Sequence, residues 1–66
     1  MAVAKVIEIS AESERNFEDA INQGIATASK TVRNIMAAWV NEQQVTVNNG
    51  KIVTYRVNLK VTFLLD

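Results

Sequence analysis

Few side chains in this sequence could carry out acid-base or covalent chemistry. It contains no histidine and no cysteine, which excludes imidazole catalysis, thiolate nucleophiles, disulfides and a structural zinc site. Its carboxylates gather at Glu12, Glu14, Glu18 and Asp19, where the start of a capped helix would also place them. No nucleophile motif and no glycine-rich phosphate loop is present. The sequence therefore predicts a binding or structural protein and not an enzyme.

The best candidate for binding a flat ligand is Trp39, the only tryptophan. It lies in the stretch 34–43, where a helical pattern gives way to a strand pattern. A large aromatic face can stack on a planar ring. A tryptophan at the start of a strand is also a common packing or interface residue, so both roles stay open for Trp39.

The charge balance disfavours two classes of partner. Seven basic and seven acidic residues give a net charge of zero, so no overall field attracts nucleic acid or an anionic membrane surface. The apolar run at the N-terminus is too short for a signal peptide, and no segment approaches a membrane span. We expect a soluble, cytoplasmic protein.

The elements that must position Trp39 can be predicted from hydrophobic spacing. Residues 3–10 are rich in valine and isoleucine and predict a short strand. Asn16 can cap a helix that follows, with Glu18 and Asp19 in its first turn. Helical spacing then relates Phe17, Ala20, Ile21, Gly24, Ile25, Ala28, Val32 and Ile35.

Two features of this predicted helix have structural consequences. Lys30 and Arg33 are expected in its last turns, where the helix dipole favours cations. Gly24 costs about 1 kcal/mol of helix propensity relative to alanine, so either another backbone approaches closely or the helix simply tolerates glycine.

Two further strands and a tight turn complete the pattern. Residues 38–47 alternate loosely, with Trp39 on one side of the predicted strand and Glu42 on the other. Asn49-Gly50 signals a hairpin turn, and residues 53–65 carry an unbroken apolar face that predicts a central strand. The fold class is α+β with the order β-α-β-β, a three-stranded antiparallel sheet wrapped on one helix. We expect a single domain over residues 1–66. A chain of 66 residues is near the lower limit for a self-sufficient core, so oligomerisation is expected.

The sequence resembles the dodecins, a family of small proteins of this element order. The resemblance extends over nearly the whole chain and depends on the order and spacing of several segments. They are Val6–Ile9, Phe17–Ile21, Ala28–Ile35, Gly50–Val57 and Lys60–Leu65.

This resemblance implies a homododecameric hollow shell that holds flavins in pairs at subunit contacts. In flavin-binding members a tryptophan stacks on the isoalloxazine ring, and Ala37 stands at that position here. Trp39 lies two residues later, where those members usually have an acid, and on the same strand face. Arg56 replaces a glutamine that hydrogen-bonds the flavin. Glu42 keeps the acidic character of a position that can hold the ribityl chain.

The resemblance leaves more than one ligand open. The shell could bind or store flavin, as FMN or riboflavin, in a site altered at Ala37, Trp39, Glu42 and Arg56. Some dodecins bind coenzyme A near basic residues at subunit contacts. A branch of the family has small residues in place of the stacking tryptophan, carries an arginine after the tyrosine of the last strand, and has been linked to calcium. The alternative is therefore a structural or calcium-binding assembly without flavin, although no metal ligands can be assigned from the sequence. Glu42 and Arg56 could instead form contacts between subunits, with Lys60 as a second partner for Glu42.

Overall fold

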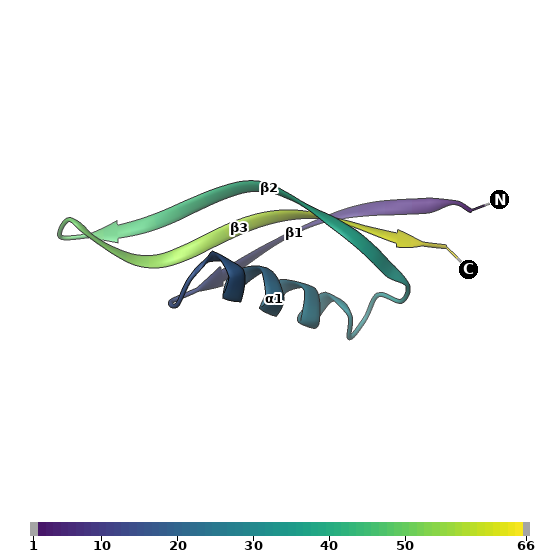
Figure 1. Cartoon of the computed structure of the whole chain (residues 1–66), viewed down its shortest axis with the longest axis horizontal. Helices are drawn as coiled ribbons and strands as arrows, with labels where there is room; N and C mark the ends of the chain where they lie inside the picture. Colours follow the sequence, from purple (N-terminus) through teal and green to yellow (C-terminus); the bar gives the residue numbers. More distant parts are fainter. Residues whose placement is uncertain (1, 66) are drawn as a thin grey trace.

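Three strands and one helix follow one another in the computed structural model, which describes residues 2–65. Strand β1 spans Ala4–Ser13, helix α1 spans Phe17–Ala28, strand β2 spans Ile35–Asn48 and strand β3 spans Lys51–Leu64 (Figure 1). This order confirms the predicted β-α-β-β fold. The two long strands of the hairpin extend beyond the region that α1 covers (Figure 1).

Strand β3 is the centre of the antiparallel sheet, as its unbroken apolar face predicts. It pairs with β1 from Ala4↔Leu64 to Ser13↔Tyr55, and with β2 along its full length. Asn49 and Gly50 both have positive φ angles, of 53° and 74°, as a tight hairpin turn requires. The predicted Asn-Gly turn is therefore confirmed.

Helix α1 packs against the middle of β1 and β3. The fully buried apolar side chains among the described residues are Ala20, Val57, Leu59 and Val61. Partly buried residues surround them, namely Ile7, Ile9, Ala11, Phe17, Ile21, Ile25 and Ile35. The core is a small cluster between α1 and the sheet. It stays small because a single helix can cover only part of the sheet.

Gly24 marks the closest approach of helix and sheet. A Cβ atom built on it would lie 3.0 Å from Ala11 Cβ and 3.3 Å from Leu59 Cδ1. The choice left open by the sequence is thus resolved in favour of a close approach, although side chains and not a backbone make it.

The start of α1 is held by a small hydrogen-bond network. Asn16 Oδ1 accepts from the backbone N–H of Asp19 at 2.7 Å, so Asn16 is the N-cap, as predicted. Ser13, which is buried, donates its hydroxyl to Asp19 Oδ2 at 2.5 Å, and Gln23 donates to the same oxygen at 2.6 Å. The Ser13 hydrogen bond, with help from Gln23 and the nearby Arg15 charge, lowers the pKa of Asp19 and outweighs desolvation.

The prediction for the end of the helix is wrong. Helix α1 stops at Ala28, and Val32 and Ile35 lie outside it. Ser29 donates both its N–H and its hydroxyl to the Ile25 carbonyl, and tighter i→i+3 bonds follow in the next residues. Asn34 then takes a positive φ of 65°, which turns the chain into β2.

This early end also changes the roles of the residues assigned to the last helical turns. Lys30 and Arg33 are in the connection, and the last turn of α1 contains no basic residue. Ile35 still packs against the core, but from the first position of β2, opposite Phe63.

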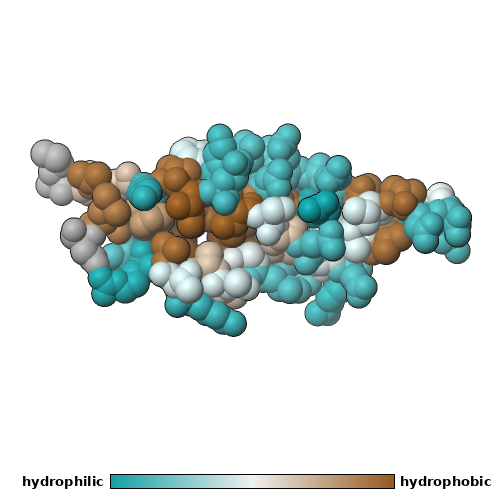
Figure 2. All heavy atoms as spheres, turned by 180° about the vertical axis from the view of Figure 1, so that it is seen from behind, coloured by the Kyte–Doolittle hydropathy of each residue, from teal (hydrophilic) through white to brown (hydrophobic). Residues whose placement is uncertain are grey.

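Many large apolar side chains remain exposed in the single chain. The molecule is elongated, with extents of 52 × 19 × 13 Å, and apolar residues gather toward both ends of its long axis (Figure 2). Examples are Val3, Met36, Leu65, Val47 and Ile52, each at least half exposed. Within residues 2–65, no helix combines the length and the apolar character needed to cross a bilayer.

Substitution of Gly24 by alanine should destabilise the protein. Alanine gains about 1 kcal/mol of helix propensity, but overpacking a filled core costs about 1–3 kcal/mol, and the contacted Ala11 and Leu59 atoms are held by the sheet. Chemical denaturation at fixed chain concentration measures the difference. Asn22→Ala, at an exposed position of the same helix, is the control and should stabilise by up to about 0.7 kcal/mol. A gain for Gly24→Ala equal to the control would contradict the close approach.

The Asp19 network should make stability depend on acid pH. Since the pKa of Asp19 is lower in the folded chain than its unfolded value of about 3.9, its contribution is complete above about pH 4 and is lost as pH falls through the folded pKa. Asp19→Asn should therefore reduce the free energy of unfolding most near neutral pH, and the difference from wild type should shrink in acid. Parallel stability curves for the two proteins from pH 7 to pH 2 would contradict this role.

Candidate functional site

The sheet face opposite α1 collects the polar residues of β3. Arg56, Asn58, Lys60 and Thr62 alternate with the buried Val57, Leu59 and Val61, so they point away from the helix. We call this side of the sheet, with the residues of β1 and β2 paired to those four, the polar face.

A β-bulge decides which residues of β2 join the polar face. The register shifts between Val40 and Glu42, so that Trp39 pairs with Lys60 and Glu42 pairs with Asn58. Simple alternation from the sequence places Trp39 and Glu42 on opposite sides, and that expectation is wrong. The extra residue, Asn41, lets an odd-numbered and an even-numbered residue face the same way.

All four residues predicted to form the site therefore lie on the polar face. Ala37 pairs with Thr62, Trp39 with Lys60 and Glu42 with Asn58, while Arg56 belongs to β3 itself. The predicted shared face of Ala37 and Trp39 is confirmed. Two residues that sequence reasoning did not assign to the site, Gln44 and Asn58, complete the group. The polar alternation of β3 could have identified Asn58, whereas Gln44 depends on the bulge.

Trp39 borders a shallow depression with Val40, Asn41 and Lys60, of about 380 Å³. Its side chain is 62% exposed, so a ring face is free to stack in the single chain. Lys60 lies directly opposite on the neighbouring strand and brings a positive charge to the edge of the depression. This combination suits a planar group that also carries an anionic group.

Glu42, Gln44, Arg56 and Asn58 line a second, smaller depression of about 140 Å³. Asn58 Nδ2 donates to Glu42 Oε1 at 3.0 Å. Arg56 Nε lies 3.2 Å from Glu12 Oε1, and both side chains are about half exposed. An exposed ion pair contributes little to stability, so Arg56 and Glu12 can exchange this contact for a ligand or another subunit at low cost.

These contacts bear on the alternative roles of Glu42 and Arg56. Each side chain has a partner in its own chain, Asn58 for Glu42 and Glu12 for Arg56. The predicted pairing of Glu42 with Arg56 or Lys60 across subunits stays a prediction. No group of three or more acidic side chains that could hold a metal ion occurs within residues 2–65. A hard cation such as calcium needs several oxygen ligands, so more than one chain would have to supply them.

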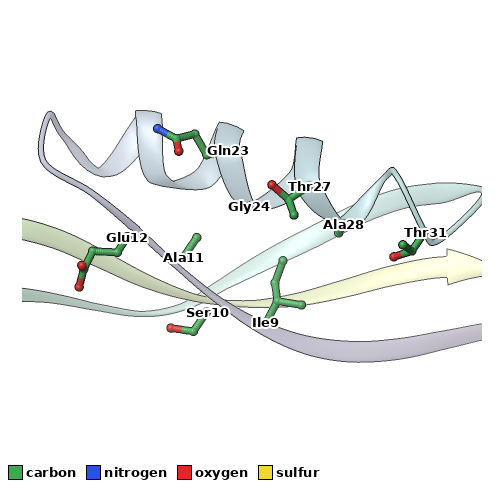
Figure 3. A pocket seen from close by; sticks show the side chains of 9 residues that line it. All are labelled: Ile9, Ser10, Ala11, Glu12, Gln23, Gly24, Thr27, Ala28 and Thr31. Atoms are coloured by element: carbon green, nitrogen blue, oxygen red, sulfur yellow. The ribbon is translucent and has the colours of Figure 1, made fainter.

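Sequence reasoning missed a groove between α1 and the outer side of β1, of about 480 Å³ (Figure 3). Ile9 and Ala11 point toward the helix, whereas Ser10 and Glu12 point away from it (Figure 3). The groove is lined by Ile9, Ser10, Ala11, Glu12, Gln23, Gly24, Thr27, Ala28 and Thr31. The small residues on facing elements were the available signal for this groove.

The architecture defines a class of small α+β proteins in which one helix lies on a three-stranded antiparallel sheet. The family model for dodecins matches residues 3–66, and the chain belongs to the dodecin family. Dodecins are non-enzymatic ligand-binding proteins whose members form oligomeric assemblies.

Individual relatives agree with this assignment. The chain is 36% identical over 63 residues to the calcium dodecin of Mycobacterium tuberculosis, covering 96% of this chain and 89% of that protein. The structure superposes on a dodecin from Streptomyces davaonensis with a TM-score of 0.93 and 34% identity, covering 98% and 96% of the two chains. For the crystal structure of the M. tuberculosis calcium dodecin, described as having a novel calcium-binding site, the TM-score is 0.83 at 38% identity, with 97% and 91% covered.

Proposed function

We propose that this chain, as one dodecin-like domain over residues 1–66, forms a non-enzymatic homododecameric shell that binds a small planar ligand on the polar face of its sheets. The observation that carries the proposal is the bulge in β2, which brings Trp39 and Glu42 to the same face as Lys60 and Arg56. The exposed apolar residues at both ends of the chain support assembly, because isolated monomers rarely expose so much apolar surface.

The planar ligand proposed is a flavin, with FMN favoured over riboflavin. Ala37 cannot stack on an isoalloxazine ring, and Trp39 offers an exposed ring on the same face. Lys60 stands beside it and would attract the phosphate of FMN. Glu42 and Asn58, which already share a hydrogen bond, would meet the hydroxyls of the ribityl chain. Coenzyme A, another phosphate-bearing ligand, would use the same cations without stacking a flavin ring.

Flavin titration tests the Trp39 site. Assembled protein should quench the fluorescence of FMN more strongly than that of riboflavin at equal concentration. Trp39→Ala should weaken FMN binding about tenfold or more, because a stacked aromatic contributes about 1–3 kcal/mol, while Trp39→Phe should retain much of the affinity. Asn22→Ala, at an exposed position of α1 outside both the polar face and the hairpin arm, is the control and should bind FMN like wild type.

Two results would count against this function. A colourless protein that leaves FMN and riboflavin fluorescence unchanged would exclude flavin binding. If Trp39→Ala instead lowers the melting temperature of the assembly equally with and without FMN, Trp39 is a packing residue between subunits and not a ligand contact.

A second candidate function is calcium binding, favoured by the similarity to the calcium dodecin of M. tuberculosis. Because the described residues hold no acidic cluster within one chain, the ion would sit where carboxylates of several copies meet. Glu42, on the polar face, is the carboxylate at one of the predicted site positions.

The cytoplasmic location stays a prediction from the sequence.

Calorimetric titration of chelator-treated protein tests the calcium candidate. Calcium should release or absorb heat and raise the melting temperature, and Glu42→Gln should reduce both effects. Glu14→Gln, in the connection before α1, is the control and should leave both unchanged. Absence of heat and of any melting shift in the wild type would reject calcium binding.

A further inference from the structure

The tip of the β2–β3 hairpin projects beyond every other element among residues 2–65. Strand β1 ends at Ser13, opposite Tyr55, and α1 begins nearby at Phe17, whose ring meets that of Tyr55 at 5.2 Å. Residues 46–54, which we call the hairpin arm, therefore have neither a third strand nor a helix over them. A two-stranded hairpin alone in water is marginally stable.

The hairpin arm carries exposed apolar side chains just behind its polar turn. Val47, Ile52 and Val53 are 60%, 54% and 45% exposed, and the β2–β3 hairpin that carries them reaches the end of the molecule opposite the start of β1 (Figure 1). Lys51 is the sole charged residue from 46 to 54. The arm thus combines three exposed aliphatic side chains with one positive charge.

The groove between α1 and β1 has complementary properties. Its facing elements bring small side chains together, including Ala11, Gly24 and Ala28, and leave about 480 Å³ open (Figure 3). Within the described part of the chain, β1 pairs with β3 alone, so the backbone groups along its other edge are unpaired by strands. Glu12 also borders the groove, but its side chain points away from the helix (Figure 3) and pairs with Arg56, so its charge lies beside β1 on the other side of the sheet.

We propose that the hairpin arm of one copy docks in the α1–β1 groove of a second copy. This inference rests on the proposed self-assembly and specifies one of its contacts. The arm includes the last residues of β2, which is the second edge strand of the sheet. The free edge of β2 in one copy can therefore pair with the free edge of β1 in another copy by strand addition. Apolar side chains of the arm then fill the space beneath α1, and Lys51 approaches the half-exposed Glu12, a contact that orients the arm more than it adds affinity.

The occupant is a segment of this chain and not a small molecule for two reasons. The free edge of β1 offers a row of backbone donors and acceptors, which a strand satisfies in full. The residues that line the groove include no aromatic ring and no pair of opposite charges, which are the groups that would orient a compact ligand. Because arm and groove lie on different parts of the chain, the contact is head-to-tail, and it closes into a ring when the rotation between copies permits.

The absence of cysteine from the sequence allows a direct cross-linking test. The double variant Val47→Cys with Thr27→Cys places one thiol on the arm and one on the groove lining. The control, Val3→Cys with Thr27→Cys, uses a residue of similar exposure at the opposite end of the molecule. Each assembled variant is oxidised mildly and separated under denaturing, non-reducing conditions, and sedimentation reports its assembly state beforehand.

We expect multimeric bands, sensitive to reductant, for the arm variant and at least tenfold less for the control. An assembled particle in which the arm pair fails to cross-link, or cross-links no better than the control, would overturn the docking while leaving self-assembly intact. A chain that sediments as a monomer would overturn both the docking and the proposed shell.

Discussion

The structure depends on how little apolar surface one helix can bury. Helix α1 covers the middle of β1 and β3, and the side chains fully buried there are Ala20, Val57, Leu59 and Val61. Burial of a whole aliphatic side chain contributes about 1.5–3 kcal/mol, whereas ordering each residue costs a comparable amount. A molecule 52 Å long whose single helix covers only part of the sheet would gain further stability from contacts between copies, as the proposed assembly provides, and the family to which the chain belongs forms oligomers.

Because α1 covers only one side of the sheet, the other side stays accessible in the single chain. Strand β3 directs its apolar residues to α1 and its polar residues to the other side of the sheet, which leaves the polar face open. The bulge at Asn41 then turns Trp39 toward that face, beside Lys60 and next to the Glu42–Asn58 hydrogen bond. The tryptophan at position 39 and the bulge together bring Trp39 and Glu42 to one face of the sheet, where the proposed ligand would bind.

Local signals in the sequence predicted the elements whose partners are close in the chain. The Asn16 cap, the Asn49-Gly50 turn and the alternation of β3 each depend on short-range geometry, and all three are confirmed. The end of α1 was mispredicted because Val32 and Ile35 keep helical spacing while the Ser29 hydrogen bonds and Asn34 turn the chain away. The faces of β2 were mispredicted because a bulge depends on the partner strand, and the α1–β1 groove was missed because it joins residues distant in sequence.

Sedimentation equilibrium of the purified, cysteine-free chain shows whether the fold depends on assembly, because it measures mass without assuming a shape. We expect a single species near twelve times the 7.3 kDa chain that persists on dilution through the micromolar range and loses its fold when it dissociates. A particle of 7.3 kDa that remains folded, with the same far-UV circular dichroism and a cooperative melting transition, would contradict it. Such a result would mean that the thin core between α1 and β3 is sufficient by itself.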